Sequence, residues 1–375
     1  MAALPQSVIA RGFSGSYHPE DVTFLLKTVE LSPTDVVVKE QLIQSGQRHY
    51  SEMLSPEYPP DAQYIRLYRA ALDRNGVRLA KDIVSLAAAL DARSRNGREI
   101  VLASLARAGT PIGILLARAL RRRGRRTAHY SISIIRDRGL DAQALAYIAA
   151  HHDPREIVFI DGWTGKGAIA NELRASLTGH SLGIVPLLAV VADPAGQADI
   201  AATDDDYLIA SGILNGVVSG LISRSILNTE LVGPGDFHAC VHYRHLAPHD
   251  LSRAFVDEID AIAAQTFPRD LDHDAHRRAR LSEECEHLVA EIMNISSTAD
   301  RNRIKPGIAE ATRAVLRRVP QRLFVRDLAD PDVQHLLHLA AKKGIHVDRL
   351  SITGRYRAVA VIKSLGSQSP QGESM

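Results

Sequence analysis

The chain has 375 residues, which is enough for about two or three domains with a substantial hydrophobic core. Its 45 Lys and Arg nearly balance its 43 Asp and Glu, and its two cysteines exclude a disulfide framework and fit a reducing compartment. The sequence shows neither a basic and apolar leader nor an apolar run of about 20 residues, so we expect no signal peptide and no membrane span. We therefore expect a cytoplasmic protein.

The charge is unevenly distributed along the chain. Between Arg301 and Lys363 there are 14 basic and 5 acidic residues, a net charge of +9 that leaves −7 for the remainder. A basic segment on an otherwise acidic protein indicates an anionic partner, with nucleic acid as the first candidate. On charge alone, an ordinary arginine-rich surface explains the segment equally well.

Residues 1–95 are predicted to form an α-rich extension. Apolar residues at helical spacing cover 21–30 and 61–72, and a break at Asn75-Gly76 precedes a further predicted helix over 77–92. Between these helices, residues 39–52 are polar and dense in titratable groups, which a hydrophobic core does not explain.

From residue 96 apolar strands alternate with helices, which predicts a second domain over 96–300. Such alternation is typical of an α/β fold in which helices cover both faces of a parallel sheet. Ligands of such sheets bind at the carboxyl ends of the strands. The predicted strands are 99–103, 127–135, 156–160 and 183–191, and the predicted helices are 111–123, 141–151 and 167–177.

Four loops fall at that edge of the sheet, and arginines and exposed backbone N–H groups recur in them. The first covers residues 104–110 and offers Arg107 with free N–H groups at the start of a helix. The second covers 136–139, the third 161–167 and the fourth 192–197. Together these loops predict an anion-binding rim.

The third loop is the most informative segment of the chain. It reads Asp161-Gly162-Trp163-Thr164-Gly165-Lys166-Gly167 and lies between a predicted strand and a predicted helix. Its glycines let a phosphate approach the N–H groups of a helix N-terminus, and Asp161 can accept hydrogen bonds from ribose hydroxyls. The loop therefore predicts a binding site for a ribose 5-phosphate. It lacks the spacing of a Walker A or dinucleotide-binding loop, and a plain strand-to-helix turn of small residues is the alternative.

The chain continues with a predicted helix over the small residues 211–228 and a charged helical region over 251–295. Residues 301–363 then read helix, strand, helix, strand, strand, which predicts a compact α/β domain. The tail 364–375 is rich in Ser, Gln and Gly and is expected to be disordered. The elements of the compact domain are predicted at 308–319, 322–326, 332–343, 345–352 and 356–362.

The order and chemistry of the four loops resemble those of type I phosphoribosyltransferases. The resemblance implies that Arg107 contacts the pyrophosphate of phosphoribosyl pyrophosphate, bound with Mg²⁺, and that Asp161 contacts its ribose. It gives both residues a catalytic role. The family usually shows a second acid where this chain has Gly162. The ligand-binding residues that the resemblance implies are Ser104, Ala108, Gly109, Thr110, Arg136, Arg138, Gly162, Trp163, Thr164, Gly165, Lys166 and Gly167.

Across nearly its full length the chain is also similar to a bacterial family of tellurite and stress-response gene clusters. The segments 43–52, 161–167 and 211–221 carry this likeness. The StiP-type family is described as a phosphoribosyltransferase-like domain followed by a Pelota-type RNA-binding domain, and it also bears the label cysteine protease. The resemblance implies a Pelota or L7Ae-like fold for 301–363, with structured RNA as partner. The predicted phosphate contacts are Lys342, Lys343, Arg355 and Arg357.

The protease label requires a thiolate, a histidine base and an oxyanion hole. Cys240 lies among histidines, whereas Cys285 lies between glutamates that disfavour its thiolate. We rank both as ordinary thiols ahead of a catalytic nucleophile. The histidines at 238, 242, 245 and 249 would share one face of a helix, but they complete no known ligand spacing, so we predict no metal site.

The loop chemistry and the resemblance together predict an enzyme that transfers phosphoribosyl to or from a nitrogenous base, with an RNA-binding C-terminal domain. Two alternatives stay open: a cysteine protease or hydrolase that uses Cys240, and a non-catalytic nucleotide sensor. The sequence does not identify the acceptor base. His49, Tyr50 and Glu52 are candidates to contact it only if the N-terminal extension folds over the ends of the strands. The sequence also leaves a homodimer open.

Overall fold

The centre of the molecule is a six-stranded sheet in which every pair of neighbouring strands is parallel. The computed structural model describes residues 12–94, 97–179, 181–272, 274–351 and 354–365. The predicted α/β class with a parallel sheet is confirmed. Along the sheet the strands follow the order β1 (Thr23–Phe24), β4 (Thr127–Ile132), β3 (Ile100–Leu105), β7 (Ile157–Trp163), β8 (Leu188–Ala192) and β9 (Ile200–Thr203).

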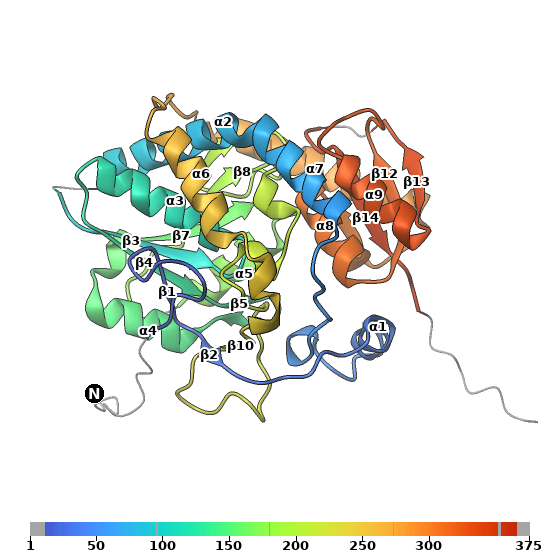
Figure 1. Cartoon of the computed structure of the whole chain (residues 1–375), viewed down its shortest axis with the longest axis horizontal. Coiled ribbons are helices and arrows are strands. Elements are labelled where there is room, and N and C mark those ends of the chain that lie inside the picture. Colours follow the sequence, from blue (N-terminus) through green and yellow to red (C-terminus); the bar gives the residue numbers. More distant parts are fainter. Residues whose placement is uncertain (1–11, 95–96, 180, 273, 352–353, 366–375) are drawn as a thin grey trace, which may run out of the picture.

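Helices cover both faces of this sheet (Figure 1). Alternate residues of its strands enter two separate hydrophobic clusters, with Leu102 and Ile160 in one and Val101 and Phe159 in the other. Burial on both faces explains why the strands are apolar runs rather than alternating patterns. The first cluster includes α2 (Ala62–Arg93), α3 (Gly109–Arg122) and α6 (Ser252–Ala263), and the second includes α4 (Ala142–His151) and α5 (Ala168–Leu177).

A second sheet of four strands forms the C-terminal part of the molecule. Helices α8 (Ile308–Arg317) and α9 (Gln334–Lys343) cover one face of it, and α7 (Ala275–Ile295) covers the other. Helix α7 precedes the predicted domain boundary at residue 301 but packs on this sheet. The order of the strands is β11 (Ile304–Pro306), β14 (Ala358–Ile362), β12 (Pro320–Val325) and β13 (His346–Arg349). The helices and strands predicted from residue 308 onward are therefore confirmed, while the predicted disorder from 366 onward lies outside the described residues.

The N-terminal extension reaches from the edge of the central sheet to the C-terminal part (Figure 1). The predicted helix over 21–30 is wrong, because this segment forms β1 and β2 (Lys27–Thr28). Strand β2 pairs with β10 (Ala239–Cys240), and the chain then continues into α1 (Val36–Gln44). Pairing with distant strands overrides the local helical spacing here.

Two further predictions are wrong in opposite directions: one predicted helix does not form, and one predicted break in a helix is absent. Residues 211–228 form only short 3₁₀ turns at Ala210–Gly212 and Gly216–Val218, because repeated glycines disfavour a continuous helix. The break predicted at Asn75-Gly76 is absent, since α2 runs through it for 32 residues. The Asn75 side chain donates to the Leu208 carbonyl, so tertiary packing holds the helix together there. No helix in the described ranges combines the length and apolar character that a membrane span requires.

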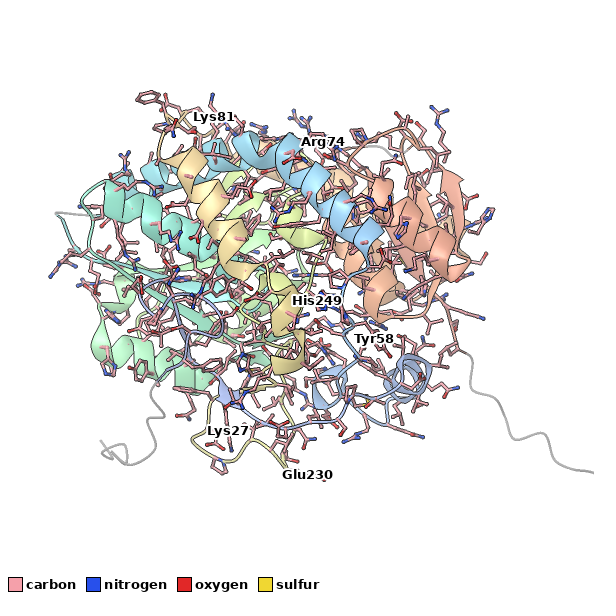
Figure 2. The ribbon with its side chains drawn as sticks, viewed as in Figure 1. Lys27, Tyr58, Arg74, Lys81, Glu230 and His249 are labelled. Carbon is pink, nitrogen blue, oxygen red and sulfur yellow. The ribbon has the colours of Figure 1, made fainter. Side chains whose placement is uncertain are left out.

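Polar contacts as well as apolar packing dock the C-terminal sheet on the central body. The buried carboxylate of Asp206 accepts hydrogen bonds from the N–H groups of Ile308, at 3.0 Å, and Arg357, at 2.9 Å. Arg74 pairs with Asp332 where α2 meets the C-terminal part (Figure 2). These contacts set the position of α8 relative to the central sheet.

Asp206→Ala is expected to lower the free energy of unfolding by roughly 2–5 kcal/mol, because two buried N–H groups lose their acceptor. Asp206→Asn keeps one acceptor oxygen and is expected to lose less. Urea denaturation of both variants and the parent measures the difference. An Asp206→Ala variant as stable as the parent would show that this carboxylate does not hold the two parts together.

Candidate functional site

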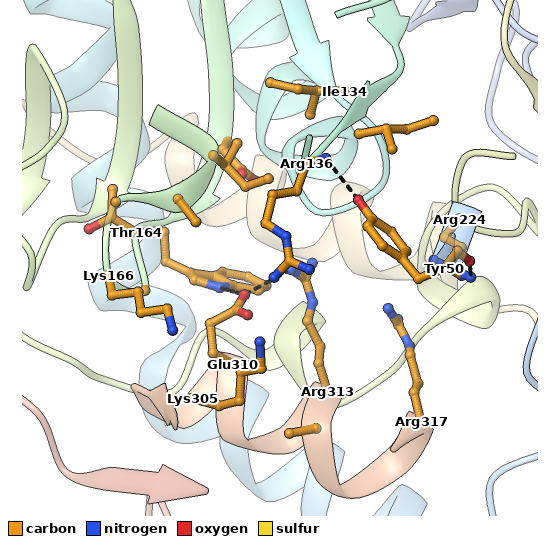
Figure 3. Close-up of a pocket in the computed structure, with 18 of the residues that line it drawn as sticks. Tyr50, Ile134, Arg136, Thr164, Lys166, Arg224, Lys305, Glu310, Arg313 and Arg317 are labelled. Atoms are coloured by element: carbon orange, nitrogen blue, oxygen red, sulfur yellow. Dashed lines mark hydrogen bonds and ion pairs between the residues drawn. The ribbon is translucent and has the colours of Figure 1, made fainter. Parts of the chain in front are cut away.

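A cavity of about 290 Å³ lies at the carboxyl end of β7, between the loop after this strand and helix α8. Helix α1 and the segment around Arg224 complete its wall. Arg136 enters it from one side and Lys305, Arg313 and Arg317 enter from the other (Figure 3). The cavity therefore joins stretches of chain that are far apart in the sequence.

The third predicted loop forms one wall of this cavity. Strand β7 ends at Trp163 and α5 begins at Ala168, so the first N–H groups of α5 lie at the cavity without an intrahelical acceptor. Gly167 between them has a φ of 82°, a conformation that glycine adopts at no steric cost. A Cβ at Gly165 would lie 2.7 Å from the Glu310 side chain of α8, so loop and helix approach closely because this residue is glycine.

The cavity is strongly cationic, with eight basic and two acidic residues in its lining. Within the described part of the chain, Arg136, Arg313 and Arg318 pair with carboxylates and the other five basic side chains do not. We call these five the uncompensated cations. They are Lys39, Lys166, Arg224, Lys305 and Arg317.

The uncompensated cations have neutral partners at most. Lys39 Nζ donates to a serine hydroxyl at 2.7 Å, and Lys166 and Arg224 donate to backbone carbonyls. Arg317 donates to an asparagine amide oxygen, while its buried Nε has no hydrogen-bond partner within the described ranges. Lys305 has no hydrogen-bond or ion-pair partner among the described residues. Partly buried charge without a counter-charge is costly, so this arrangement favours an anionic ligand.

This concentration of positive charge shifts several pKa values. Burial, together with the charges of neighbouring arginines, lowers the pKa of Lys39 to about 6. Burial and the charge of Lys166 lower the pKa of Lys305 to about 7, and burial lowers that of Lys166 to about 8. Burial raises the pKa of Asp161 to about 7. Several perturbed groups in one cavity are typical of functional sites.

A surface groove of about 780 Å³ adjoins the cavity. Ile43, Tyr50, Arg136 and Arg318 line both hollows, so the groove and the cavity are adjacent. The Tyr50 hydroxyl accepts a hydrogen bond from the Arg136 N–H at 2.8 Å, which holds the second predicted loop against the N-terminal extension. Arg138 of that loop lines the groove rather than the cavity.

The first predicted loop does not supply its arginine to the cavity. Arg107 is buried, and its guanidinium forms a bidentate pair with Glu57 at 2.6 and 3.1 Å. It also donates to the Ile222 carbonyl at 2.8 Å. A carboxylate of the chain itself therefore neutralises the arginine that was predicted to bind pyrophosphate. The other predicted residues of this loop, which pack within the fold, are Ser104, Ala108, Gly109 and Thr110.

The second and third predicted loops do contribute to the cavity. The predicted residues that line it are Arg136, Asp161, Trp163, Thr164, Gly165, Lys166 and Gly167, whereas Gly162 is not among its lining residues. The Thr164 hydroxyl donates to Asp193 at 2.5 Å, so it is already engaged. Sequence reasoning missed Lys39, Arg224, Lys305, Arg313 and Arg317. The titratable segment 39–52 and the basic excess after residue 301 were the only signals of them.

The four basic side chains predicted to contact RNA are all engaged within the chain. Lys342 pairs with Asp61, and Arg357 pairs with Asp205 at 2.8 Å. Arg355 also pairs with a carboxylate, and Lys343 donates to a backbone carbonyl. Their contact with RNA stays a prediction, and it requires a ligand to replace these partners.

Both cysteines are buried, with exposed fractions of 0% for Cys240 and 2% for Cys285. Burial raises the pKa of both thiols, that of Cys240 to about 12. The histidine-rich segment around Cys240 forms β10 and a 3₁₀ turn over Arg244–His249, not the helix that a shared histidine face would need. In the described ranges, no three His, Cys, Asp or Glu side chains are grouped so as to hold a metal ion.

Comparison with known proteins decides the family. A family model described as "Tellurite-like stress resistance cysteine protease StiP" matches residues 15–260. A protein of Acinetobacter baylyi named "Cysteine protease StiP" is 43% identical over 375 residues, which covers 96% of each chain. The chain belongs to the StiP family. The predicted family membership is thus confirmed.

The C-terminal part of this StiP-family chain matches a second model, described as "PELOTA RNA binding domain", over residues 283–364. The match begins within α7 and ends after β14, so it includes the second sheet and the helices on both its faces. A solved structure of HGPRT-ase from Leishmania tarentolae in complex with GMP aligns with 37% of this chain and 77% of that chain. Its identity of 14% and TM-score of 0.25 carry no argument.

These comparisons correct the main activity predicted from the sequence. The predicted transferase acting on phosphoribosyl pyrophosphate conflicts with the family and the relative, which are both named as cysteine proteases. The alternative of a cysteine protease or hydrolase agrees with them better. Within the fold, Glu57 already neutralises Arg107, on which the predicted pyrophosphate contact depended. The predicted Mg²⁺ stays a prediction.

Lys305→Met is expected to raise the free energy of unfolding at neutral pH by about 1–4 kcal/mol, because an apolar side chain replaces an uncompensated cation. The folded-state pKa of about 7 lies below the ordinary lysine value. The destabilisation of the folded state by charged Lys305 is therefore complete below that pKa. It vanishes as the pH approaches about 10.4, the pKa of an unperturbed lysine. Urea denaturation at acidic and alkaline pH checks both points. Equal stability of variant and parent at acidic pH would mean that Lys305 is already compensated.

Proposed function

We propose that this StiP-family protein binds RNA, and that RNA phosphates are held where helix α8 meets the loop after β7. The match of residues 283–364 to the PELOTA RNA binding domain carries the proposal. Helix α8 lies within this match and presents Arg313 and Arg317 to the cavity, beside Lys305 of β11. Contacts from such side chains to phosphates supply most of the sequence-independent affinity for nucleic acids.

The distribution of paired and unpaired charge supports the α8 face over the four residues singled out in the sequence. Lys342, Arg355 and Arg357 already pair with carboxylates of the chain, so RNA contacts there would only exchange one anion for another. The uncompensated cations would gain their first anionic partner. Because they are already desolvated, a charge-assisted contact with them stabilises a complex more.

The finer fold assignment belongs to this proposal too. We propose a type I phosphoribosyltransferase-like fold for the parallel sheet and a Pelota or L7Ae-like fold for the second sheet. The order of the loops along the sheet supports the first assignment, and the PELOTA match supports the second. The first assignment concerns architecture alone, since one fold hosts many unrelated activities.

The double variant Lys305→Gln with Arg317→Gln, which removes two of the uncompensated cations, is expected to weaken RNA binding at least about tenfold, or ~1.4 kcal/mol. It should also reduce the slope of log affinity against log salt concentration by about 2, because two phosphate contacts are lost. The matched control is Lys342→Gln with Arg355→Gln, which removes the same charge from side chains that already have carboxylate partners. The control is expected to bind RNA nearly as the parent does.

Fluorescence anisotropy with structured and single-stranded RNA at several salt concentrations measures both effects, and circular dichroism verifies that the variants are folded. Equal weakening by the two double variants would place RNA elsewhere on the C-terminal part. If the parent binds no RNA even at low salt, the proposed function is wrong.

Cysteine proteolysis is the second candidate function, and the names of the family and of the relative favour it. Cys240 lies near Arg107, whose charge lowers the pKa of the thiol, but burial outweighs this effect. Strand β10, which carries Cys240, pairs with β2. A peptide would therefore reach the thiol only after the residues that bury Cys240 move away.

Alkylation tests whether such opening occurs. We expect iodoacetamide to modify Cys240 in the native protein at least about tenfold more slowly than in the urea-unfolded chain, because little thiolate forms and access is blocked. Mass spectrometry of the alkylated peptides measures the rate for each cysteine. Proteolysis of a denatured protein substrate that disappears in Cys240→Ala and persists in Cys285→Ala would establish the second candidate instead.

A further inference from the structure

The groove and the cavity lie side by side. The groove of about 780 Å³ and the cavity of about 290 Å³ share four residues in their walls. In the cavity Arg313 lies over the Trp163 ring, 4.7 Å from its centre, and Trp163 donates to Glu310 at 3.3 Å. Beyond Trp163, Arg313 and Arg317 there is a pocket of only about 10 Å³. A strand in the groove can therefore place its end in the cavity, since the next pocket holds no more than about one water molecule.

With all of its uncompensated cations protonated, the cavity carries more positive charge than one internal phosphate can balance. A phosphodiester within a strand carries a single negative charge. A terminal phosphate monoester carries roughly 1.5 to 2 negative charges at neutral pH and three acceptor oxygens. The uncompensated cations and the first N–H groups of α5 together offer several donors to one group of this kind.

We propose that the cavity binds the terminal phosphate of an RNA strand, so that this protein recognises an RNA end rather than an internal segment. The inference rests on the proposed RNA binding and adds the chemical group that is recognised. Lys39 and Arg224 belong to the N-terminal body, whereas Lys305 and Arg317 belong to the C-terminal part. One phosphate between them would connect the two parts of the molecule.

The protonation of the site agrees with this assignment. Lys39 and Lys305 have lowered pKa values because burial and neighbouring cations disfavour their charged forms. A phosphate dianion supplies the missing counter-charge and restores those charged forms. The site therefore becomes fully cationic only when the ligand is present.

Four forms of one single-stranded oligoribonucleotide test the inference with the full-length protein: a 5′-phosphate, a 3′-phosphate, hydroxyls at both ends, and a circularised strand. At least one phosphorylated form is expected to bind about tenfold more tightly than the hydroxyl form, ~1.4 kcal/mol. The circular form should bind no better than the hydroxyl form. Inorganic phosphate should compete more strongly with the phosphorylated strand than with the hydroxyl strand.

Lys305→Met should remove the preference for the phosphorylated strand, and Lys27→Met, a matched change at a lysine that pairs with Asp236, should retain it. Urea denaturation of Lys305→Met checks that any loss does not come from unfolding. Equal affinity for all four strands would overturn the inference and leave the proposed RNA binding intact. A preference that survives Lys305→Met would place the phosphate elsewhere and would also overturn it. Absence of binding to every strand would overturn the proposed function itself.

Discussion

Helix α8 is held over the carboxyl edge of the central sheet, and the rest of the site depends on that position. Asp206 binds the N–H group at the start of the helix, and Gly165 lets the loop after β7 approach it closely. Without this contact the loop would be a solvent-exposed helix N-terminus with one lysine beside it. With the contact, cations from two parts of the chain converge on one cavity.

Within the described residues, most basic side chains inside this molecule form ion pairs, whereas the uncompensated cations of the cavity do not. Most buried or half-buried arginines have carboxylate partners, as Arg107 has Glu57 and Arg118 has Asp21. The cavity departs from this rule, because five of its basic side chains have no carboxylate partner among the described residues. A fold selected for stability alone would pair or remove such charges. This departure supports the proposal that an anionic ligand binds in the cavity.

The two candidate functions, RNA binding and cysteine proteolysis, require different conformations of the chain. RNA binding at α8 uses the conformation described here, in which the groove and the cavity are already formed. Proteolysis by Cys240 requires a thiolate at a position where burial raises the thiol pKa to about 12 and leaves nothing exposed. The two functions therefore differ in whether the residues that bury Cys240 have to move.

The sequence by itself determined the parallel sheet, the loop from Asp161 to Gly167, the C-terminal α/β unit and the family, because apolar periodicity and short motifs are local properties. It misassigned 21–30 and 211–228, where strand pairing and glycine-rich packing override local spacing. It could not show which charges are neutralised. The partner of Arg107 lies 50 residues away, and the uncompensated cations come from segments spread between α1 and α8. Only the tertiary structure decides such pairings, because the strength of an ion pair depends on distance and burial in space rather than on separation along the chain.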